Sequence, residues 1–472
     1  MRANVHIRFP QGAFARLHQR LLQDKQREAF ALLLGQSHRF EDYTVIKVVE
    51  MDIARPEDYT SQGIAHLRLK REYIYDRLVK MQRQGHADTL IDVHTHPFCT
   101  QGAAFSGVDD RDERVFHQWL GDTLDNVHYA SIVLSQTDYA ARLWERRQNR
   151  LFAIPAQIKT QTVAEAWPCA QQPPDKRPCE QNTFARATDA QQGFLARSVL
   201  ALGLENLRRM TNDQRIAVVG VGGLGSIIAE HLVHSGFMHL DLIDHDVLEI
   251  TNLNRIVGAY YRDAKAARLK VKTVQQHLQR INPFATIHAH PQRIEEDSLL
   301  PVLARADWII LATDDHASRF KTQEIALRFG IPLLSAGVNI TVEAGQISDM
   351  SGEVIIARQG DRLCLNCLGR ISTTRLAAQA FPDLGKTLAA RGYVSGAEVK
   401  EPAVKTLNAL LATLSVDLLI NQYTERQPHV PVWVYENNLA PCIYPDTDSV
   451  AQRRKDCFYC HDTCSDTAAV SH

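Results

Sequence analysis

The feature that most constrains the fold is a glycine-rich loop between a predicted strand and a predicted helix in the second half of the chain. The apolar, β-branched run 215–221 is typical of a strand, and the pattern over 224–235 predicts a helix. The loop that joins them contains Gly220, Gly222, Gly223 and Gly225. Glycines let backbone N–H groups approach a phosphate, and a helix N-terminus adds partial positive charge. On these residues alone, a plain dinucleotide-binding fold is the better interpretation.

The elements expected around this loop alternate between strand and helix. We expect strands over 239–244, 285–290, 308–312 and 331–336, and helices over 264–281, 318–329 and 404–421. Such alternation predicts an α/β fold with a mostly parallel, doubly wound, Rossmann-like sheet. Asp244 ends the strand after the loop, where a carboxylate can accept hydrogen bonds from ribose hydroxyls.

Polar motifs that a hydride-transfer enzyme does not need follow the loop. They are Asp244-His-Asp246, Asn252-Leu-Asn254-Arg255, Lys270 ahead of Ile281-Asn282-Pro283, and Thr313-Asp314 after a buried strand. In this order they closely resemble the ThiF/MoeB and ubiquitin-activating superfamily, over about residues 194–460. The resemblance implies that ATP adenylates a protein C-terminus and that pyrophosphate leaves.

The resemblance also implies a role for each polar residue around the nucleotide. Negative charge builds up on the phosphoryl oxygens during adenylation, so fixed cations and a metal are required there. The implied roles are ribose binding by Asp244, phosphate binding by Arg255 and Lys270 with Asn252 beside them, and organisation of Mg²⁺ at the α-phosphate by Asp314.

Arg197 lies in the predicted helix just before the glycine-loop domain. It is similar to the arginine that these enzymes lend across a dimer interface to the γ-phosphate of the partner subunit. The resemblance therefore implies a homodimer. The alternative is that Arg197 is a solvated charge on a helix surface.

Two Cys-x-x-Cys pairs indicate a metal site in the second segment. The pairs are Cys364 with Cys367 and Cys457 with Cys460. Four thiolates are a common ligand set for tetrahedral Zn²⁺ with a structural role. The site would tie the C-terminal tail to the loop after the main sheet, an arrangement that also resembles ThiF/MoeB proteins. A redox pair is the lesser alternative.

The sequence departs from ubiquitin-type activating enzymes, which carry a nucleophilic cysteine in the crossover loop. No cysteine occurs between Leu368 and Pro441. We expect Cys442 to be a buried small residue rather than a nucleophile. The sequence therefore favours adenylation over thioester formation, with the activated carboxylate passing to a sulfur donor or to a cysteine of another protein.

The first segment carries a second set of candidate metal ligands. His94 and His96 follow a short predicted strand over 89–93, and histidines at i and i+2 of an extended chain point to the same side. Asp109 would be the third ligand and would leave a fourth position for water, as in hydrolytic zinc sites. Glu28, before a leucine-rich run that ends at Gly35, is the best candidate for the general base.

This order resembles the JAMM/MPN metalloproteases over about residues 10–150: a glutamate, HxHP and SxxD. The resemblance implies an α+β, cytidine-deaminase-like domain in which the hydroxyl of Ser106 stabilises the oxyanion. Twelve residues separate His96 from Asp109, where the family typically has ten. Either the loop bulges or Asp110 replaces Asp109. An inactive MPN scaffold is the alternative.

Composition sets the domain boundaries and the expected compartment. Proline and glutamine are dense before residue 192, which predicts a metalloprotease domain over 1–155, a linker over 156–192 and an adenylating domain over 193–472. The 53 basic and 54 acidic residues give no overall field to recruit nucleic acid or a membrane. No apolar run suits a membrane span or a secretory signal, so we expect the cytoplasm.

Three functions remain open from the sequence. In the leading one, the first unit trims or removes a ubiquitin-like protein and the second adenylates its C-terminal glycine, as in bacterial conjugation systems, including antiviral ones, that use a conjugating-enzyme-like partner. In the second, the same chemistry prepares a sulfur-carrier protein for cofactor or metabolite synthesis. In the third, the chain is an inactive binding scaffold.

Overall fold

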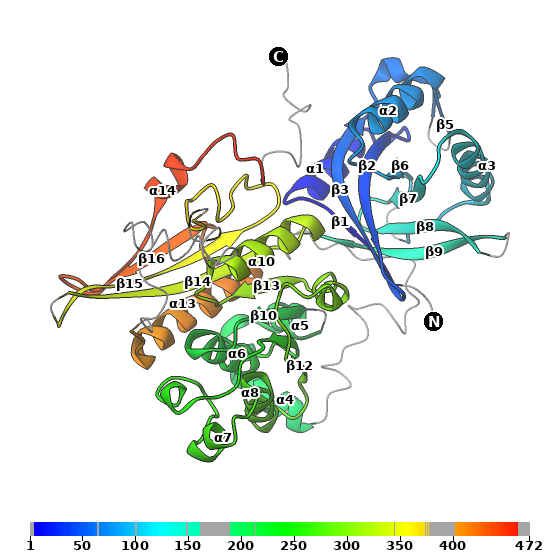
Figure 1. Cartoon of the computed structure of the whole chain (residues 1–472). Coiled ribbons are helices and arrows are strands. Elements are labelled where there is room, and N and C mark those ends of the chain that lie inside the picture. Colours follow the sequence, from blue (N-terminus) through cyan, green and yellow to red (C-terminus); the bar gives the residue numbers. More distant parts are fainter. Residues whose placement is uncertain are drawn as a thin grey trace. The chain divides into compact units, whose positions relative to one another are not determined.

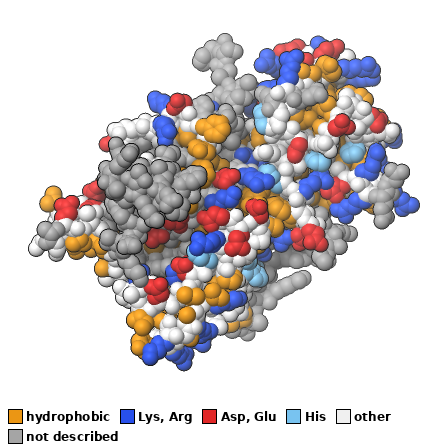
Figure 2. Space-filling model, in the orientation of Figure 1, with side chains coloured by type: hydrophobic (Ala, Val, Ile, Leu, Met, Phe, Trp, Pro, Cys, Tyr) orange, Lys and Arg blue, Asp and Glu red, His pale blue; other side chains and the backbone are white. Residues whose placement is uncertain are grey.

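The structure is a computed structural model. It describes residues 4–63, 66–99, 102–147, 150–160, 189–212, 214–343, 345–372, 374, 376 and 402–460. The described residues up to 160 belong to one compact unit, and those from 189 to 460 belong to a second unit (Figure 1). Within the described residues, no helix has the length and apolar character needed to cross a bilayer. On the face drawn in Figure 2, basic and acidic side chains are interspersed.

The N-terminal unit is built on a closed barrel with the strand order β1-β3-β2-β6-β7-β8-β9. The strands are β1 (Asn4–Arg8), β2 (Phe30–Arg39), β3 (Tyr43–Ile53), β6 (Thr89–Thr95), β7 (His128–Leu134), β8 (Tyr139–Arg147) and β9 (Arg150–Lys159). Its helices are α1 (Ala13–Leu21), α2 (Arg71–Gln84) and α3 (Gly107–Thr123), and β4 (Tyr59–Gln62) and β5 (Leu67–Leu69) form a small hairpin.

Strand β2 is covered on both faces, which explains its nearly continuous apolar sequence. Ala31 and Leu33 join the hydrophobic cluster that contains α1, whereas Leu32 and Leu34 join the cluster that contains α2 and part of α3. Successive side chains of a strand point to opposite faces, so a strand with two buried faces has no polar alternation. This double burial fixes β2 beside β6, the strand that leads to the histidine pair.

Two predictions for the N-terminal unit were wrong in their boundaries. The linker does not begin at residue 156, because β9 continues to Lys159 and pairs with β1, with Ala156 buried. The apolar spacing over Gly63–Gln84 predicts a helix, but α2 begins only at Arg71, because Leu67 and Leu69 belong to β5. Leu67 and Leu69 are two residues apart, a spacing that suits one face of a strand and not one face of a helix, and both pair with β4.

The C-terminal unit contains an eight-stranded sheet with the order β12-β11-β10-β13-β14-β15-β16-β17. The first five are parallel: β12 (Thr286–His290), β11 (His239–Ile243), β10 (Arg215–Val219), β13 (Trp308–Leu311) and β14 (Leu333–Glu343). The last three, β15 (Gln346–Ala357), β16 (Val432–Glu436) and β17 (Cys442–Pro445), extend the sheet in antiparallel fashion. The sequence predicted the parallel half and missed the antiparallel extension.

The helices of this unit connect the strands. They are α4 (Asp189–Leu202), α5 (Leu204–Asn212), α6 (Gly223–Ser235), α7 (Tyr261–Lys265), α8 (Lys270–Ile281), α9 (Leu300–Leu303), α10 (His316–Phe329), α13 (Lys405–Thr424) and α14 (Thr447–Gln452). The single helix expected over 264–281 is two helices, because the segment between them bridges Leu269 to Val247. This interruption brings the start of α8 beside the segment that follows β11.

The turn from β10 into α6 depends on two of its glycines. Gly220 has a φ of 86°, a left-handed conformation that side chains other than glycine adopt with strain. A Cβ at Gly225 would overlap the carbonyl oxygen of Gly220, whereas a Cβ at Gly222 would meet no atom within 4 Å. The closeness of strand and helix therefore requires glycine at position 225 and not at position 222.

We expect Gly225→Ala to destabilise the chain by about 1–3 kcal/mol, the usual cost of overpacking, despite the better helix propensity of alanine. Gly222→Ala is the matched control and should unfold at the wild-type urea concentration. Urea unfolding followed by circular dichroism measures both. Equal midpoints for the two variants would show that the strand–helix contact is not as close as described.

Candidate functional site

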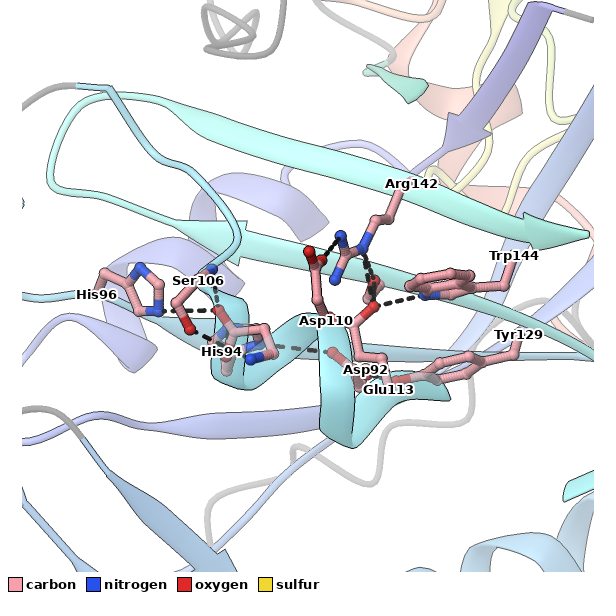
Figure 3. A network of polar contacts seen from close by, with 11 residues as sticks. Asp92, His94, His96, Ser106, Asp110, Glu113, Tyr129, Arg142 and Trp144 are labelled. Atoms are coloured by element: carbon pink, nitrogen blue, oxygen red, sulfur yellow. Dashed lines mark hydrogen bonds and ion pairs between the residues drawn. The ribbon is translucent and has the colours of Figure 1, made fainter. Parts of the chain in front are cut away.

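Three side chains at metal-ligand spacing meet at the end of β6 (Figure 3). His94 lies in β6, His96 follows it, and Asp109 lies in the first turn of α3. The Nε2 atoms of His94 and His96 lie 3.5 and 3.7 Å from the two carboxylate oxygens of Asp109. Both histidines are buried, and Asp109 is largely buried.

These distances suit ligands that share an ion better than groups that bond to each other. Zn–N and Zn–O bonds of about 2.0–2.1 Å at tetrahedral angles place ligand atoms roughly 3.3 Å apart. At 3.5 Å or more, a side-chain hydrogen bond is poor. The buried Nε2 of His94 also has no hydrogen-bond partner among the described residues. The chemistry and spacing of this trio therefore fit a zinc ion.

Asp110, the alternative third ligand, is engaged elsewhere. Its carboxylate pairs with Nη1 of Arg142 at 2.5 Å. The structure thus brings Asp109, not Asp110, to the two histidines. In the described part of the loop between His96 and Asp109, Asp138 accepts hydrogen bonds from the N–H groups of Gly102 and Ala103.

Charges around His94 favour a cation at this position. Burial opposes a charged ring, but Asp109 and Asp92 outweigh it and raise the pKa of His94 to about 10. Despite burial, His94 and Ser106 hold the pKa of Asp109 below its usual range. Oδ1 of Asp92 lies 3.6 Å from Nδ1 of His94, on the side of the ring opposite Asp109. Asp92, whose side chain also accepts the hydroxyl of Tyr129, was missed by the sequence reasoning.

Glu28 is held next to the trio by the backbone. The hydroxyl of Thr95 accepts the N–H of Ala29, and the N–H of Thr95 donates to the carbonyl of Ala29. Since Thr95 lies between the two histidines, these bonds fix Glu28 near them. Burial, opposed by the charge of His94 and reinforced by that of Asp109, raises the pKa of Glu28 to about 7. A carboxyl group with that pKa can accept a proton near neutral pH.

Ser106 is the N-cap of α3. Its hydroxyl accepts the N–H of Asp109 at 3.2 Å, and its own N–H donates to the carboxylate of Asp109 at 2.6 Å. This reciprocal cap holds the Asp109 carboxylate in place. The cap uses the hydroxyl oxygen of Ser106 as an acceptor and therefore leaves its O–H able to donate.

The glycine loop of the C-terminal unit is organised around Asp244, just beyond β11. Its two carboxylate oxygens accept the N–H groups of Val221 and Asp246, at 2.8 and 2.9 Å. The carboxylate is only partly buried. Each oxygen has a second lone pair, which can accept a hydrogen bond from a ribose hydroxyl.

Two cations lie near this loop. Nζ of Lys270, at the start of α8, pairs with Asp246 at 2.7 Å. Arg255 lies close to Gly223, since a Cβ on that glycine would come within 2.8 Å of the arginine side chain. Asn252 is buried, and its side-chain oxygen accepts the N–H of Glu249 at 3.0 Å. The structure therefore gathers these three predicted residues around the strand ends.

Asp314 and Arg197 are the remaining predicted residues. Asp314 is exposed in the turn between β13 and α10, while the neighbouring Asp315 caps α10 by accepting the N–H of Ser318 at 2.8 Å. The cap leaves Asp314, and not Asp315, available for a ligand. Arg197 is exposed on α4, and its role across a dimer interface stays a prediction.

The four cysteines of the two Cys-x-x-Cys pairs form a buried cluster, Cys364, Cys367, Cys457 and Cys460. Sγ of Cys364 lies 3.6 Å from that of Cys457, and Sγ of Cys460 lies 4.0 Å from that of Cys367. Zn–S bonds of about 2.3 Å at tetrahedral angles place sulfur atoms roughly 3.8 Å apart. The cluster therefore fits a zinc ion. Cys442, expected to be buried, is instead exposed, because it lies on β17, the last strand of the sheet.

Comparison with known proteins identifies both units. Residues 195–451 match the family model "ThiF family", and residues 10–147 match "Prokaryotic homologs of the JAB domain". The first match spans more than half of the 472 residues, so the chain belongs to the ThiF family. It joins a JAB-like N-terminal domain to a ThiF C-terminal domain, as the two resemblances predicted.

Several relatives are named adenylyltransferases. "Adenylyltransferase and sulfurtransferase uba4" of Ogataea parapolymorpha is 31% identical over 146 residues, covering 31% of this chain and 36% of that protein. "Sulfur carrier protein adenylyltransferase" of Thermus thermophilus is 29% identical over 136 residues, covering 29% and 48%. "Molybdopterin-synthase adenylyltransferase" of Salmonella typhimurium is 30% identical over 159 residues, covering 34% and 60%. The chain thus spans between 36% and 60% of the length of these relatives.

The two ligand sets predict two zinc ions per chain, measurable by mass spectrometry of the metal content. His96→Ala should lose one ion, because two ligands do not hold zinc in a hydrolytic site. Cys457→Ala should lose the other. Cys442→Ala is the matched control for the second variant and should keep both. If His96→Ala retained both ions, the trio would not be a zinc site.

Proposed function

We propose that this chain activates the C-terminal carboxylate of a ubiquitin-like or sulfur-carrier protein with ATP, and that its N-terminal unit is a zinc-dependent isopeptidase acting at the same C-terminus. The proposal depends on one observation: a trio at zinc-ligand spacing, His94, His96 and Asp109, occurs in the same chain as a ThiF nucleotide loop. The first proposed domain ends with β9 at Lys159 and the second begins with α4 at Asp189, and the second contains a Cys₄ zinc knuckle.

For adenylation, a carboxylate oxygen of the carrier attacks the α-phosphorus of ATP, and the bond to the bridging oxygen breaks as pyrophosphate leaves. The N–H groups of Gly222, Gly223 and Gly225 at the start of α6 face the phosphates, Gly220 provides the turn that brings them there, and Asp244 binds the ribose. Arg255 and Lys270 offset the charge that builds up on the phosphoryl oxygens. Asp314 holds Mg²⁺, and Arg197 of a second copy completes the site in a homodimer.

For hydrolysis, His94, His96 and Asp109 hold the zinc ion. When bound, such an ion acts as a Lewis acid that polarises a carbonyl and makes water more acidic. Glu28 takes the proton of the attacking water and returns it to the leaving amine. The O–H of Ser106 donates to the oxyanion of the tetrahedral intermediate.

Sulfur transfer is the second candidate. Two observations favour it: the names of the relatives, which include a sulfur-carrier adenylyltransferase, and the lack of cysteine between Leu368 and Pro441. Without a thiol there, the adenylate passes directly to a sulfur donor. In a conjugation pathway it passes to a cysteine of a conjugating-enzyme-like partner. In both pathways the proposed compartment is the cytoplasm.

Adenylation is tested with ATP, Mg²⁺ and two probes: a ubiquitin-like protein and a sulfur-carrier protein, each ending in glycine. Intact mass spectrometry should detect a gain of one AMP on at least one probe, and pyrophosphate exchange should accompany it. Lys270→Ala should reduce exchange by about 100-fold or more, because one cation at the phosphates is lost. Lys272→Ala, an exposed change on the same helix, should not alter exchange. Binding of NAD without binding of ATP would contradict the proposal.

Hydrolysis is tested with the same probes carrying a C-terminal extension after the glycine. Glu28→Gln should slow cleavage by about 100- to 10,000-fold, the usual contribution of a general base, and should keep the zinc content of the wild type. Glu41→Gln, an exposed change nearby in sequence, is the control. Cleavage by Glu28→Gln at the wild-type rate would mean that another group is the base.

A further inference from the structure

A buried arginine close to the candidate zinc site contacts the segment that carries Asp109. Arg142 is in β8, and its side chain is only 7% exposed. Its guanidinium lies 3.6 Å from the ring centroid of Phe105. The same group bonds to Asp110 at 2.5 Å through Nη1 and to Glu113 at 2.8 Å through Nε (Figure 3). Arg142 therefore contacts both ends of the segment from 105 to 110.

We propose that Arg142 is a positioning residue that selects Asp109 as the metal ligand, an inference that rests on the zinc site proposed above. Successive residues of an α-helix are about 100° apart around its axis, since 3.6 residues make one turn. When Arg142 binds Asp110, the rotation of the first turn is fixed. Asp109 then faces the two histidines. If α3 turned about its axis, it would move Asp109 away from them.

Glu113, one turn further along α3, secures this rotation. One of its carboxylate oxygens accepts hydrogen bonds from the hydroxyl of Ser131 and the indole N–H of Trp144, each at 2.6 Å, as well as from Arg142. Ser131 lies in β7 and Trp144 in β8, so α3 is tied to two strands. A buried carboxylate with three donors is held firmly, because each donor that is lost makes its burial more costly.

The arrangement also balances buried charge next to the metal. Asp110 and Glu113 are two carboxylates bonded to Arg142, and burial, reinforced by the charge of Asp92, raises the pKa of Glu113. A single guanidinium with forked donors can bond to Asp110 and Glu113 together, which an ammonium group cannot do with the same geometry. The geometry points to an arginine-specific role, not only to a need for positive charge.

The test compares Arg142→Lys and Asp110→Asn with the wild-type chain by competition with a chromophoric zinc chelator. Of the two zinc ions, the one followed is the ion that the His96→Ala variant lacks. Both variants should bind it more weakly, Arg142→Lys by about 10- to 100-fold, as is usual for groups that orient metal ligands. With Co²⁺ in place of zinc, the visible spectrum should change because the ligand geometry changes. Arg147→Lys, an exposed change on the same strand, should leave affinity and spectrum unaltered.

Unchanged affinity and an unchanged Co²⁺ spectrum in Arg142→Lys would overturn the inference. If that variant does not fold, Asp110→Asn decides, because its side chain is 47% exposed and its loss leaves the core intact. A lower melting temperature with the wild-type spectrum would mean that Arg142 only stabilises the fold, which also overturns the inference. Absence of this zinc equivalent from the wild-type chain would instead refute the proposed metal site itself.

Discussion

Both candidate sites depend on the same constraint: a buried strand fixes the backbone up to the residue at which the polar groups begin. Thr95 ends β6, and its hydrogen bonds to Ala29 hold two histidines and a glutamate around one point. In the C-terminal unit, the strands β10, β11 and β13 end in the glycine loop, in Asp244 and in the turn that carries Asp314. Parallel strands bring these ends to one edge of the sheet, which is where α/β folds bind ligands.

The polar groups beyond these strand ends are held by helix caps as well as by buried neighbours. Asp109 is fixed by the cap of α3, Asn252 by a cap at Glu249, and Asp315 caps α10 beside Asp314. A cap satisfies the free N–H groups of a helix and at the same time fixes the direction of a side chain. In this way the hydrogen bonds of the caps orient these side chains and offset part of the desolvation that burial of Asp109 and Asn252 costs.

The sequence predicted what is local and failed where distant residues decide. Short patterns with a defined spacing could be predicted: the glycine loop, the parallel strands, the HxHP pair and the two Cys-x-x-Cys pairs. The role of Arg142 could not be predicted, since it lies 32 residues beyond Asp110 in an ordinary strand sequence, and only the pairing of β8 with β7 brings it to α3. The strands β15–β17 were missed for a similar reason, because their pairing depends on the preceding strand and not on their own pattern.

The two proposed activities are chemically consecutive, which gives a physical reason for their presence in one chain. Hydrolysis of the bond after the terminal glycine of the carrier releases a free carboxylate, and a free carboxylate is the group that adenylation consumes. A carrier that binds one unit is at a raised local concentration for the other, so the tether favours processing followed by activation. The fusion of the two units has the opposite effect on a finished conjugate. Cleavage of the conjugate releases the carrier close to the activating unit. The balance between these two directions depends on whether ATP and an acceptor are present, since ATP is consumed in forming the adenylate and an acceptor is needed to take up the activated carboxylate afterwards.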